Sequence, residues 1–213
     1  MSFMREYAEW NDFWWEKAGD FDCRRVLLIG DSITRSYRDR VQERLRPLRI
    51  AADKLCGSRC AGDPMLEAEL SLSTGPLNGY RYEAIHFNNG LHGVCNDTLI
   101  PLDVYCDGVR RIVEILRQNQ PQAKIVIATS TPISVRGTND ISRLDPDNET
   151  ILARNAFLRR FAKEEGLLLD DLYGLVTADA SFAKTDYVHF EKSAAVRLGD
   201  RVADLLLTAL GEG

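Results

Sequence analysis

The sequence predicts a three-layer α/β/α fold with a mostly parallel central sheet. Short apolar runs alternate along most of the chain with amphipathic stretches of helical length, which is typical of parallel strands joined by helices that cover both faces of a sheet. The chain has 213 residues, of which 45% are hydrophobic, and this is enough to bury a sizeable core. Because no repeat, low-complexity tract or linker interrupts the pattern, we expect a single domain over residues 1–213.

The predicted strands are short runs of apolar residues. Residues 26–29 read Val-Leu-Leu-Ile and residues 124–128 are rich in β-branched side chains, as expected for strands that are buried on both faces. The expected strands cover residues 25–29, 48–52, 82–87, 124–128 and 167–169.

The predicted helices follow from apolar residues at helical spacing. They cover residues 7–17, 35–45, 64–72, 102–118, 149–165 and 192–210. The first of them carries Trp10, Phe13, Trp14 and Trp15, which we expect to dock it on the core; a surface for an acyl group or a partner is the alternative.

Two connections are irregular. Residues 54–63 are rich in glycine and cysteine, and residues 131–148 contain Pro132, Gly137, Pro146 and several aspartates and asparagines. Long loops in compact domains are often functional, and we interpret residues 131–148 as an insertion over one end of the sheet.

Composition and charge narrow the class of partner. The formal net charge is −5 and no basic run interleaved with aromatic residues occurs, which argues against nucleic acid and anionic membranes as partners. Residues 1–20 mix charged and aromatic side chains and do not resemble a signal peptide, and no run approaches the roughly 18 apolar residues of a membrane span. The five cysteines are an odd number, which favours free thiols in the cytoplasm; a Cys56–Cys60 disulfide is the alternative.

Two short motifs near opposite ends of the chain supply the residue types of a serine hydrolase. Gly30-Asp31-Ser32 follows the strand predicted at 25–29, and Asp186 precedes His189 by three residues. A serine hydroxyl attacks a carbonyl carbon when a base takes its proton, and a carboxylate holds that base in one tautomer. Ser32, His189 and Asp186 are therefore the predicted nucleophile, base and orienting acid. Asp31 is expected to anchor the turn.

These motifs resemble the blocks of the SGNH, or GDSL-type, hydrolases. Gly30-Asp31-Ser32-Ile33 is similar to the family's first block, and Asp186-Tyr187-Val188-His189, followed by a terminal helix, is similar to its last. Either motif alone would be weak, because a serine at a strand end is often just a helix cap. Together, in this order, they span most of the chain. The resemblance implies a flavodoxin-like sandwich and an ester-hydrolysing activity.

The resemblance also implies an oxyanion hole, and here the chain departs from the family pattern. Gly62 matches the backbone donor of the second block, with Gly57 as an alternative. The third block usually reads Gly-x-Asn-Asp, whereas this chain has Asn88-Asn89-Gly90-Leu91-His92. Aligned on Gly90, His92 takes the donor position, and an imidazole can donate one N–H. The other possibility is the side-chain amide of Asn88 or Asn89, and both Asn89 and His92 are kept as expected donors. Each of these residues could instead serve only the loop structure.

The sequence analysis therefore predicts a serine esterase or deacylase that acts on a small-molecule ester, with an acetylated carbohydrate suggested by analogy alone. An acyltransferase with the same triad and a noncatalytic binding domain are the alternatives. No nucleotide fingerprint or zinc-type ligand spacing occurs, and His86 falls inside a predicted strand, so we expect no cofactor and no metal. The oligomeric state is left open.

Overall fold

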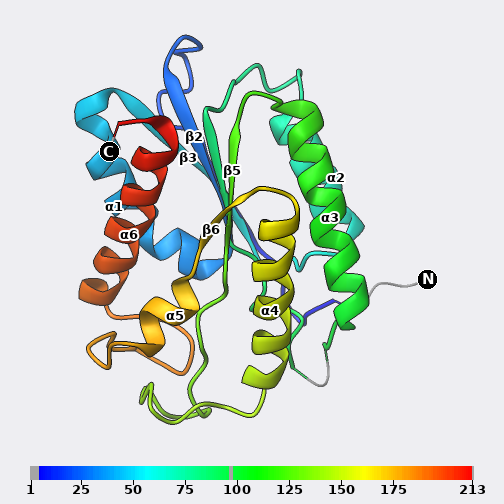
Figure 1. Ribbon diagram of the computed structural model, residues 1–213, viewed down its shortest axis with the longest axis vertical. Helices are drawn as coiled ribbons and strands as arrows, with labels where there is room; N and C mark the ends of the chain where they lie inside the picture. Colours follow the sequence, from blue (N-terminus) through cyan, green and yellow to red (C-terminus); the bar gives the residue numbers. More distant parts are fainter. Residues whose placement is uncertain (1–4, 96–97, 213) are drawn as a thin grey trace.

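The computed structural model describes residues 5–95 and 98–212. Its centre is a six-stranded sheet with the strand order β1-β3-β2-β4-β5-β6 (Figure 1). The strands are β1 (Asn11–Trp14), β2 (Arg24–Gly30), β3 (Ile50–Gly57), β4 (Ala84–Phe87), β5 (Lys124–Ala128) and β6 (Leu168–Asp170).

Strands β2 to β6 are parallel, and β1 pairs antiparallel with β3 at the edge of the sheet. Because β3 lies on one side of β2 and β4 on the other, the chain reverses its direction of winding between β2 and β4. The carboxyl ends of these two strands therefore flank a topological switch point, where open α/β sheets bind their ligands.

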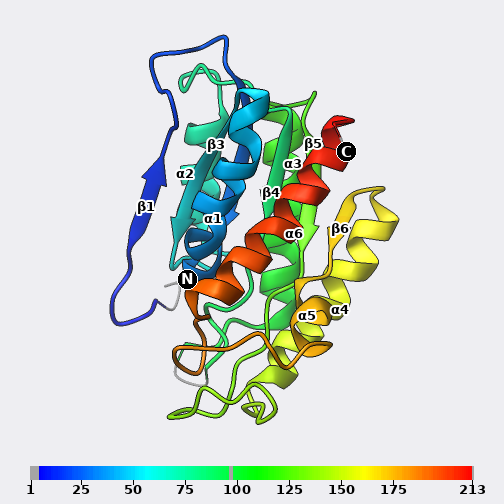
Figure 2. The ribbon, with the colours of Figure 1, turned by 90° about the vertical axis from the view of Figure 1, so that its left-hand side faces the viewer.

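Helices cover both faces of the sheet (Figures 1 and 2). On one face lie α1 (Ser32–Leu45), α5 (Leu172–Thr177) and α6 (Lys192–Leu210). On the other lie α2 (Pro64–Thr74), α3 (Leu102–Asn119) and α4 (Asn148–Glu164). A short 3-10 helix, η1 (Arg46–Leu48), follows α1. The predicted three-layer fold with a mostly parallel sheet is confirmed.

The two cores follow from the alternation of side chains along buried strands. In β2, Val26 and Leu28 point to the layer that contains α1 and α6, whereas Leu27 and Ile29 point to the layer that contains α2, α3 and α4. This two-sided burial explains why the strand is an unbroken apolar run. No helix in the described part of the chain has the length and apolar character needed to cross a membrane.

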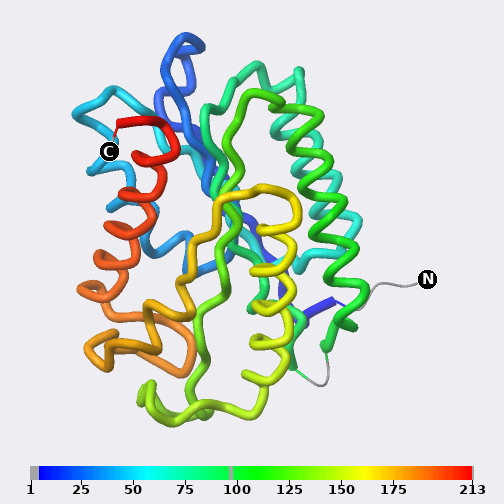
Figure 3. Tube along the Cα trace, viewed as in Figure 1, coloured from blue at the N-terminus to red at the C-terminus, as the bar shows by residue number. Residues whose placement is uncertain are grey.

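The helix predicted over residues 7–17 is wrong, because the chain there is extended and forms β1. Figure 2 shows β1 at the edge of the sheet beside β3, and Figure 3 traces the whole chain in the orientation of Figure 1. Without β1, the edge of β3 would present unpaired backbone groups. Within the segment, Phe13 and Trp15 pack against the core while Trp14 is exposed, an alternation that a strand permits and a helix does not.

A buried arginine anchors the chain between β1 and β2. Arg25 is fully buried, pairs with Asp53 at 3.1 Å, and donates to the carbonyl oxygens of Glu16, Lys17 and Asp20. Its guanidinium thus fixes a loop that has few hydrogen bonds of its own.

The remaining differences are at element boundaries and in one connection. The other five predicted helices and the five predicted strands are present. The strand at 124–128 and the helix at 192–210 have the predicted bounds, and the others have shifted ends. The loop predicted at 54–63 begins later, because β3 continues to Gly57, and the short helix α5 was not predicted. Residues 131–147 have no helix and only one isolated bridge, Ser134 to Leu144. They lie beyond the carboxyl ends of the strands (Figure 1). All five cysteines are free.

Candidate active site

Ser32 is the first residue of α1 and follows directly on β2. The turn between them is tight because Asp31 caps the helix, with its Oδ1 accepting from the Ile33 N–H at 2.9 Å. Gly30 is required in this turn, since a Cβ there would clash with Thr34 and with the Asn88 backbone. The serine is therefore held at the carboxyl edge of the sheet, beside the switch point.

His189 and Asp186 lie on the loop that leads into α6. Asp186 Oδ1 accepts from the backbone N–H groups of Val188 and His189, both at 2.7 Å. Thr185 N–H donates to the His189 carbonyl oxygen. These bonds form a compact turn that places both side chains on one side.

The structure brings the three predicted catalytic residues into one hydrogen-bonded chain. His189 Nε2 lies 2.9 Å from Ser32 Oγ, and His189 Nδ1 lies 2.8 Å from Asp186 Oδ2. The Asp186 carboxylate can only accept, so Nδ1 carries a proton and Nε2 is left to accept from the serine hydroxyl. Burial raises the pKa of Asp186, but the hydrogen bonds from His189 and Val188 outweigh it, and its pKa lies below the ordinary value.

Lys184 stabilises this turn through hydrogen bonds to the backbone. Its side chain is buried, and Nζ donates to the carbonyl oxygens of Pro132 and Tyr187 at 2.6 and 3.1 Å. Ser134 N–H adds a bond to the Tyr187 carbonyl oxygen. The start of the 131–147 segment is thereby fastened to the loop that carries His189.

Ser32 and His189 open into a cavity of about 590 Å³. The cavity is accessible from solvent, since the side chain of His189 in its wall is 46% exposed. Apolar residues form part of the wall, namely Leu91, Val94, Ile133 and Val188. Aromatic, charged and small polar side chains form the rest, and the Arg35 guanidinium lies 4.9 Å from the centre of the Trp10 ring.

His92 lines the same cavity, on the loop that follows β4. Its Nδ1 lies 2.8 Å from Glu6 Oε1, and within the described residues its Nε2 has no hydrogen-bond partner. Burial lowers the pKa of His92, but the bond to Glu6 and the charges of Asp31 and Glu6 outweigh this, and the pKa lies above the ordinary value. Of the expected oxyanion-hole residues, His92 is the one whose side chain reaches the cavity.

Gly62 and Asn89 do not reach the cavity. Gly62 packs against α3, where a Cβ on Gly108 would clash with its amide nitrogen, and it is not among the residues that line the cavity. The Asn89 side chain is buried, accepting from the Ala61 N–H and donating to the Arg59 carbonyl oxygen, both at 2.8 Å. Its amide therefore organises the loop after β3 and is not free to bind an oxyanion.

The two alternatives, Gly57 and Asn88, also lie outside the cavity. Gly57 pairs with Asn11 of β1. Asn88 is buried, and its Nδ2 has no hydrogen-bond partner among the described residues.

Several residues at the site were missed by the sequence analysis. Glu6, Tyr7 and Trp10 form one wall, although they were expected on or beside a helix that docks on the core. Arg154 of α4 is fully buried and donates to the carbonyl oxygens of Gly90, His92, Gly93 and Ile100. No local motif marks such residues, because their roles depend on contacts between segments distant in sequence.

No family model and no curated protein sequence matches this chain, but solved structures do. A carbohydrate esterase family 3 protein from Talaromyces cellulolyticus is 15% identical, with a TM-score of 0.70 over 89% of this chain and 99% of that one. A GDSL-like lipase from Bacteroides thetaiotaomicron is 15% identical, with a TM-score of 0.62 over 89% and 88%. A candidate SGNH hydrolase from Slackia heliotrinireducens is 16% identical, with a TM-score of 0.64 over 86% and 99%.

The chain has the SGNH-hydrolase fold. The match covers most of the chain and of each neighbour, so it includes the sheet and both helical layers. In this SGNH fold, Ser32 is the first residue of α1, His92 lies on the loop after β4, and His189 lies on the loop before α6. Among the described residues no group of three or more histidine, cysteine, aspartate or glutamate side chains is arranged to hold a metal ion.

Proposed function

We propose that this protein is a serine esterase that hydrolyses small esters through Ser32, His189 and Asp186. The observation that carries the proposal is the continuous chain of hydrogen bonds from Ser32 Oγ through the imidazole of His189 to Asp186. Such a chain activates a serine hydroxyl on any fold that provides it. Its position at the switch point of an SGNH fold supports the same activity.

In the proposed mechanism, Ser32 Oγ attacks the ester carbonyl carbon while His189 Nε2 takes the hydroxyl proton. The imidazolium is stabilised by Asp186 and then donates its proton to the departing alcohol, which leaves an acyl group on Ser32. Water enters, His189 removes its proton, and attack on the acyl carbon releases the acid and restores the serine.

We assign the stabilisation of the tetrahedral oxyanion to His92 and to the backbone N–H of Ser32. The His92 side chain lies in the cavity wall, and its Nε2 has no hydrogen-bond partner among the described residues. Ser32 occupies the first turn of α1, where N–H groups have no partner inside the helix and the helix dipole favours negative charge. Each lost donor would cost on the order of 10²- to 10³-fold in rate.

An acetylated carbohydrate is our proposed class of substrate. The cavity is open and has Tyr7, Trp10 and Tyr187 in its wall, and aromatic side chains with a polar tip suit a sugar ring. Structural neighbours include an acetyl xylan esterase and a carbohydrate acetylesterase, which favours this class over long-chain lipids. Acetate release from acetylated oligosaccharides, compared with hydrolysis of acetyl and butyryl esters, tests it.

The first experiment measures hydrolysis of p-nitrophenyl acetate and butyrate by the wild type and by Ser32→Ala and His189→Ala. We expect a loss of about 10³-fold or more in kcat for both variants and fluorophosphonate labelling of Ser32. Ser36→Ala is the matched control, since Ser36 lies one turn further along α1 and its Oγ donates only to the Ile33 carbonyl oxygen. A folded wild type that neither turns over ester nor takes the label would support the noncatalytic binding domain. Product analysis with added alcohols separates hydrolysis from acyl transfer.

A further inference from the structure

We propose that Glu6 is a positioning residue for His92, holding a proton on Nδ1 so that only the imidazolium form presents an N–H to the oxyanion. The inference rests on the proposed function, in which His92 contributes to the oxyanion hole. Glu6 belongs to the segment before β1, far in sequence from every motif of the site.

The contact is specific. Glu6 Oε1 lies 2.8 Å from His92 Nδ1 and also accepts from the Gly93 N–H at 3.4 Å. Both side chains line the cavity that holds Ser32, and they are 31% and 20% exposed, respectively. The carboxylate therefore meets the imidazole at Nδ1, and Nε2 is left without a hydrogen-bond partner among the described residues.

The protonation states follow from the chemistry of the two groups. Burial raises the pKa of Glu6, but its bonds to His92 and Gly93 outweigh this and the pKa lies below the ordinary value, so Glu6 is an ionised acceptor at neutral pH. A carboxylate can bind Nδ1 only if Nδ1 carries hydrogen. In neutral His92, Nε2 then has a lone pair and repels an oxyanion. In the imidazolium, Nε2–H is a charge-assisted donor.

The charges around His92 come from several elements. Glu6 and the buried Asp31 favour the imidazolium, whereas burial and Arg154, which binds the His92 carbonyl oxygen, oppose it. Other titratable or charged groups in the cavity wall are Tyr7, Arg35, Cys95, Arg136, Tyr187 and His189. Among the described residues, only Glu6 hydrogen-bonds the ring.

The segment that carries Glu6 is fastened on both sides of it. Arg5 pairs with the buried Asp63 at 3.1 Å, and Glu9 pairs with Arg59. The Trp10 backbone bonds to Ser58 through both its N–H and its carbonyl oxygen. These contacts hold the carboxylate in place without a helix or strand at Glu6 itself.

The proposal gives the reaction a distinct pH dependence. As pH rises through the pKa of His92, Nε2 loses its proton and kcat falls. A glutamine at position 6 can donate to Nδ1 and so permits neutral His92 to carry the proton on Nε2. In Glu6→Gln we therefore expect kcat to be lower by roughly tenfold at neutral pH, because the donor is no longer charged. We also expect that kcat of this variant no longer declines at alkaline pH.

The test combines nuclear magnetic resonance with kinetics. In ¹⁵N-histidine-labelled protein, which has only three histidines, two-bond ¹H–¹⁵N spectra report the tautomer and pKa of His92, assigned with His92→Asn. We expect His92 of the wild type to be the Nδ1–H tautomer at high pH. In Glu6→Gln we expect His92 to gain the Nε2–H tautomer and its pKa to be lower by about one unit. Glu9→Gln is the matched control for loosening of the segment, and it should keep the wild-type tautomer and the alkaline decline.

The outcomes separate the two proposals. A wild type without esterase activity would overturn the proposed function and the catalytic use of Glu6 together. An active wild type with the Nε2–H tautomer of His92, or a Glu6→Gln profile that keeps the alkaline decline, would overturn the role of Glu6 alone.

Discussion

The Asp186 carboxylate serves two purposes with its two oxygens. Oδ2 binds the imidazole Nδ1 of His189, and Oδ1 binds the backbone N–H groups of Val188 and His189. The same group therefore fixes the tautomer of the base and shapes the turn that carries it. Because one carboxylate does both, a spacing of three residues between Asp186 and His189 is sufficient to orient the imidazole.

We expect Asp186→Asn to lower kcat by on the order of 10²- to 10⁴-fold, because an amide can donate to Nδ1 and so favours the wrong tautomer. Steady-state hydrolysis of p-nitrophenyl acetate measures the effect. Asp39→Asn is the control, since the Asp39 side chain is 88% exposed and pairs only with its neighbour Arg38. Equal kcat values in Asp186→Asn and the wild type would remove Asp186 from the proposed triad.

Lys184 is an ionisable side chain whose burial disfavours the charged form. Burial lowers the pKa of Lys184 to about 8 from 10.5, with Asp186 opposing the shift. Between these two values the unfolded chain binds more protons than the folded chain does, so the Lys184 contribution makes the free energy of unfolding rise with pH in that window.

We therefore expect the free energy of unfolding of the wild type, relative to Lys184→Met, to increase by roughly 2 kcal/mol between pH 7.5 and 9.5. Urea unfolding of both proteins at the two pH values gives this difference, and groups common to both cancel. A difference that stays constant with pH would mean that Lys184 titrates normally.

For individual residues, the sequence analysis was informative where the residue belongs to a local motif. Ser32, Asp186 and His189 could be selected because their chemistry and their position after predicted elements agree. Gly62 and Asn89 could not be judged, because whether their amide groups face the cavity depends on contacts with Gly108 and Arg59. Glu6 carries no signal in the sequence, since its partner lies 86 residues away.

Among the elements, α4 stabilises the loop after β4 through a single side chain. The buried Arg154 guanidinium donates to four carbonyl oxygens, between 2.6 and 3.2 Å away. It has no ion pair within the described residues, so these carbonyl dipoles and the face of the Tyr105 ring compensate its charge. The position of His92 thus depends on Arg154, which makes the only hydrogen bonds from α4 to this loop among the residues that the structure describes.

We expect Arg154→Met to lower the free energy of unfolding by roughly 3 kcal/mol, because buried carbonyl groups lose their donors. Urea unfolding provides the measurement. Arg160→Met on the same helix is the control: its side chain is 62% exposed and forms a long ion pair of 3.8 Å, so a change within about 0.5 kcal/mol is expected. Similar losses in both variants would contradict the role of Arg154.

The elements themselves were predicted well where periodicity is strong, as in α3 and α6. The exception, β1, shows the limit of local patterns. Its aromatic residues fit either the apolar face of a helix or an alternating strand. Pairing with the free edge of β3 selects the strand, and a short stretch of sequence does not reveal that this edge is free.

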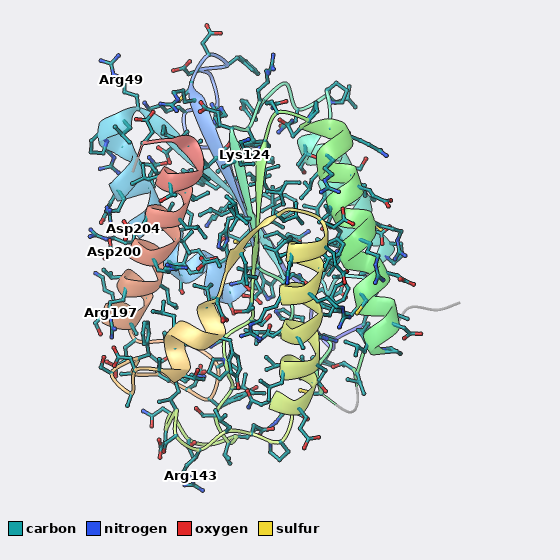
Figure 4. All side chains as sticks on the ribbon, in the orientation of Figure 1. Arg49, Lys124, Arg143, Arg197, Asp200 and Asp204 are labelled. Carbon is teal, nitrogen blue, oxygen red and sulfur yellow. The ribbon has the colours of Figure 1, made fainter. Side chains whose placement is uncertain are left out.

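In the molecule as a whole, the two halves of the proposed catalytic machinery are joined by packed helices. Ser32 begins α1, and His189 lies three residues before the start of α6. The helices approach closely at Gly199, where a Cβ would clash with Arg40 and with the Tyr37 backbone. Asp200 and Asp204 of α6, labelled in Figure 4, pair with Arg40 and Arg44 of α1.

Because one sheet connects both helical layers, we propose that residues 1–213 form one domain and expect a single cooperative unfolding transition. Calorimetry should give equal calorimetric and van't Hoff enthalpies. Esterase activity should be lost at the same temperature as the tryptophan fluorescence signal of the native state. Two resolved transitions would mean that parts of the chain fold independently.

The hairpin-like excursion at residues 135–143 has a consequence for how such proteins diversify. Its base is held by backbone hydrogen bonds from Val135 to Arg143 and from Ser134 to Tyr187, and it carries none of the three proposed catalytic residues. Insertions and deletions at its tip could change what reaches the cavity while the α1–α6 pair keeps Ser32 and His189 in register. The fold thus lets substrate selectivity and the proposed chemistry evolve separately. A combinatorial library confined to residues 135–143 is the natural way to change which substrates the protein accepts.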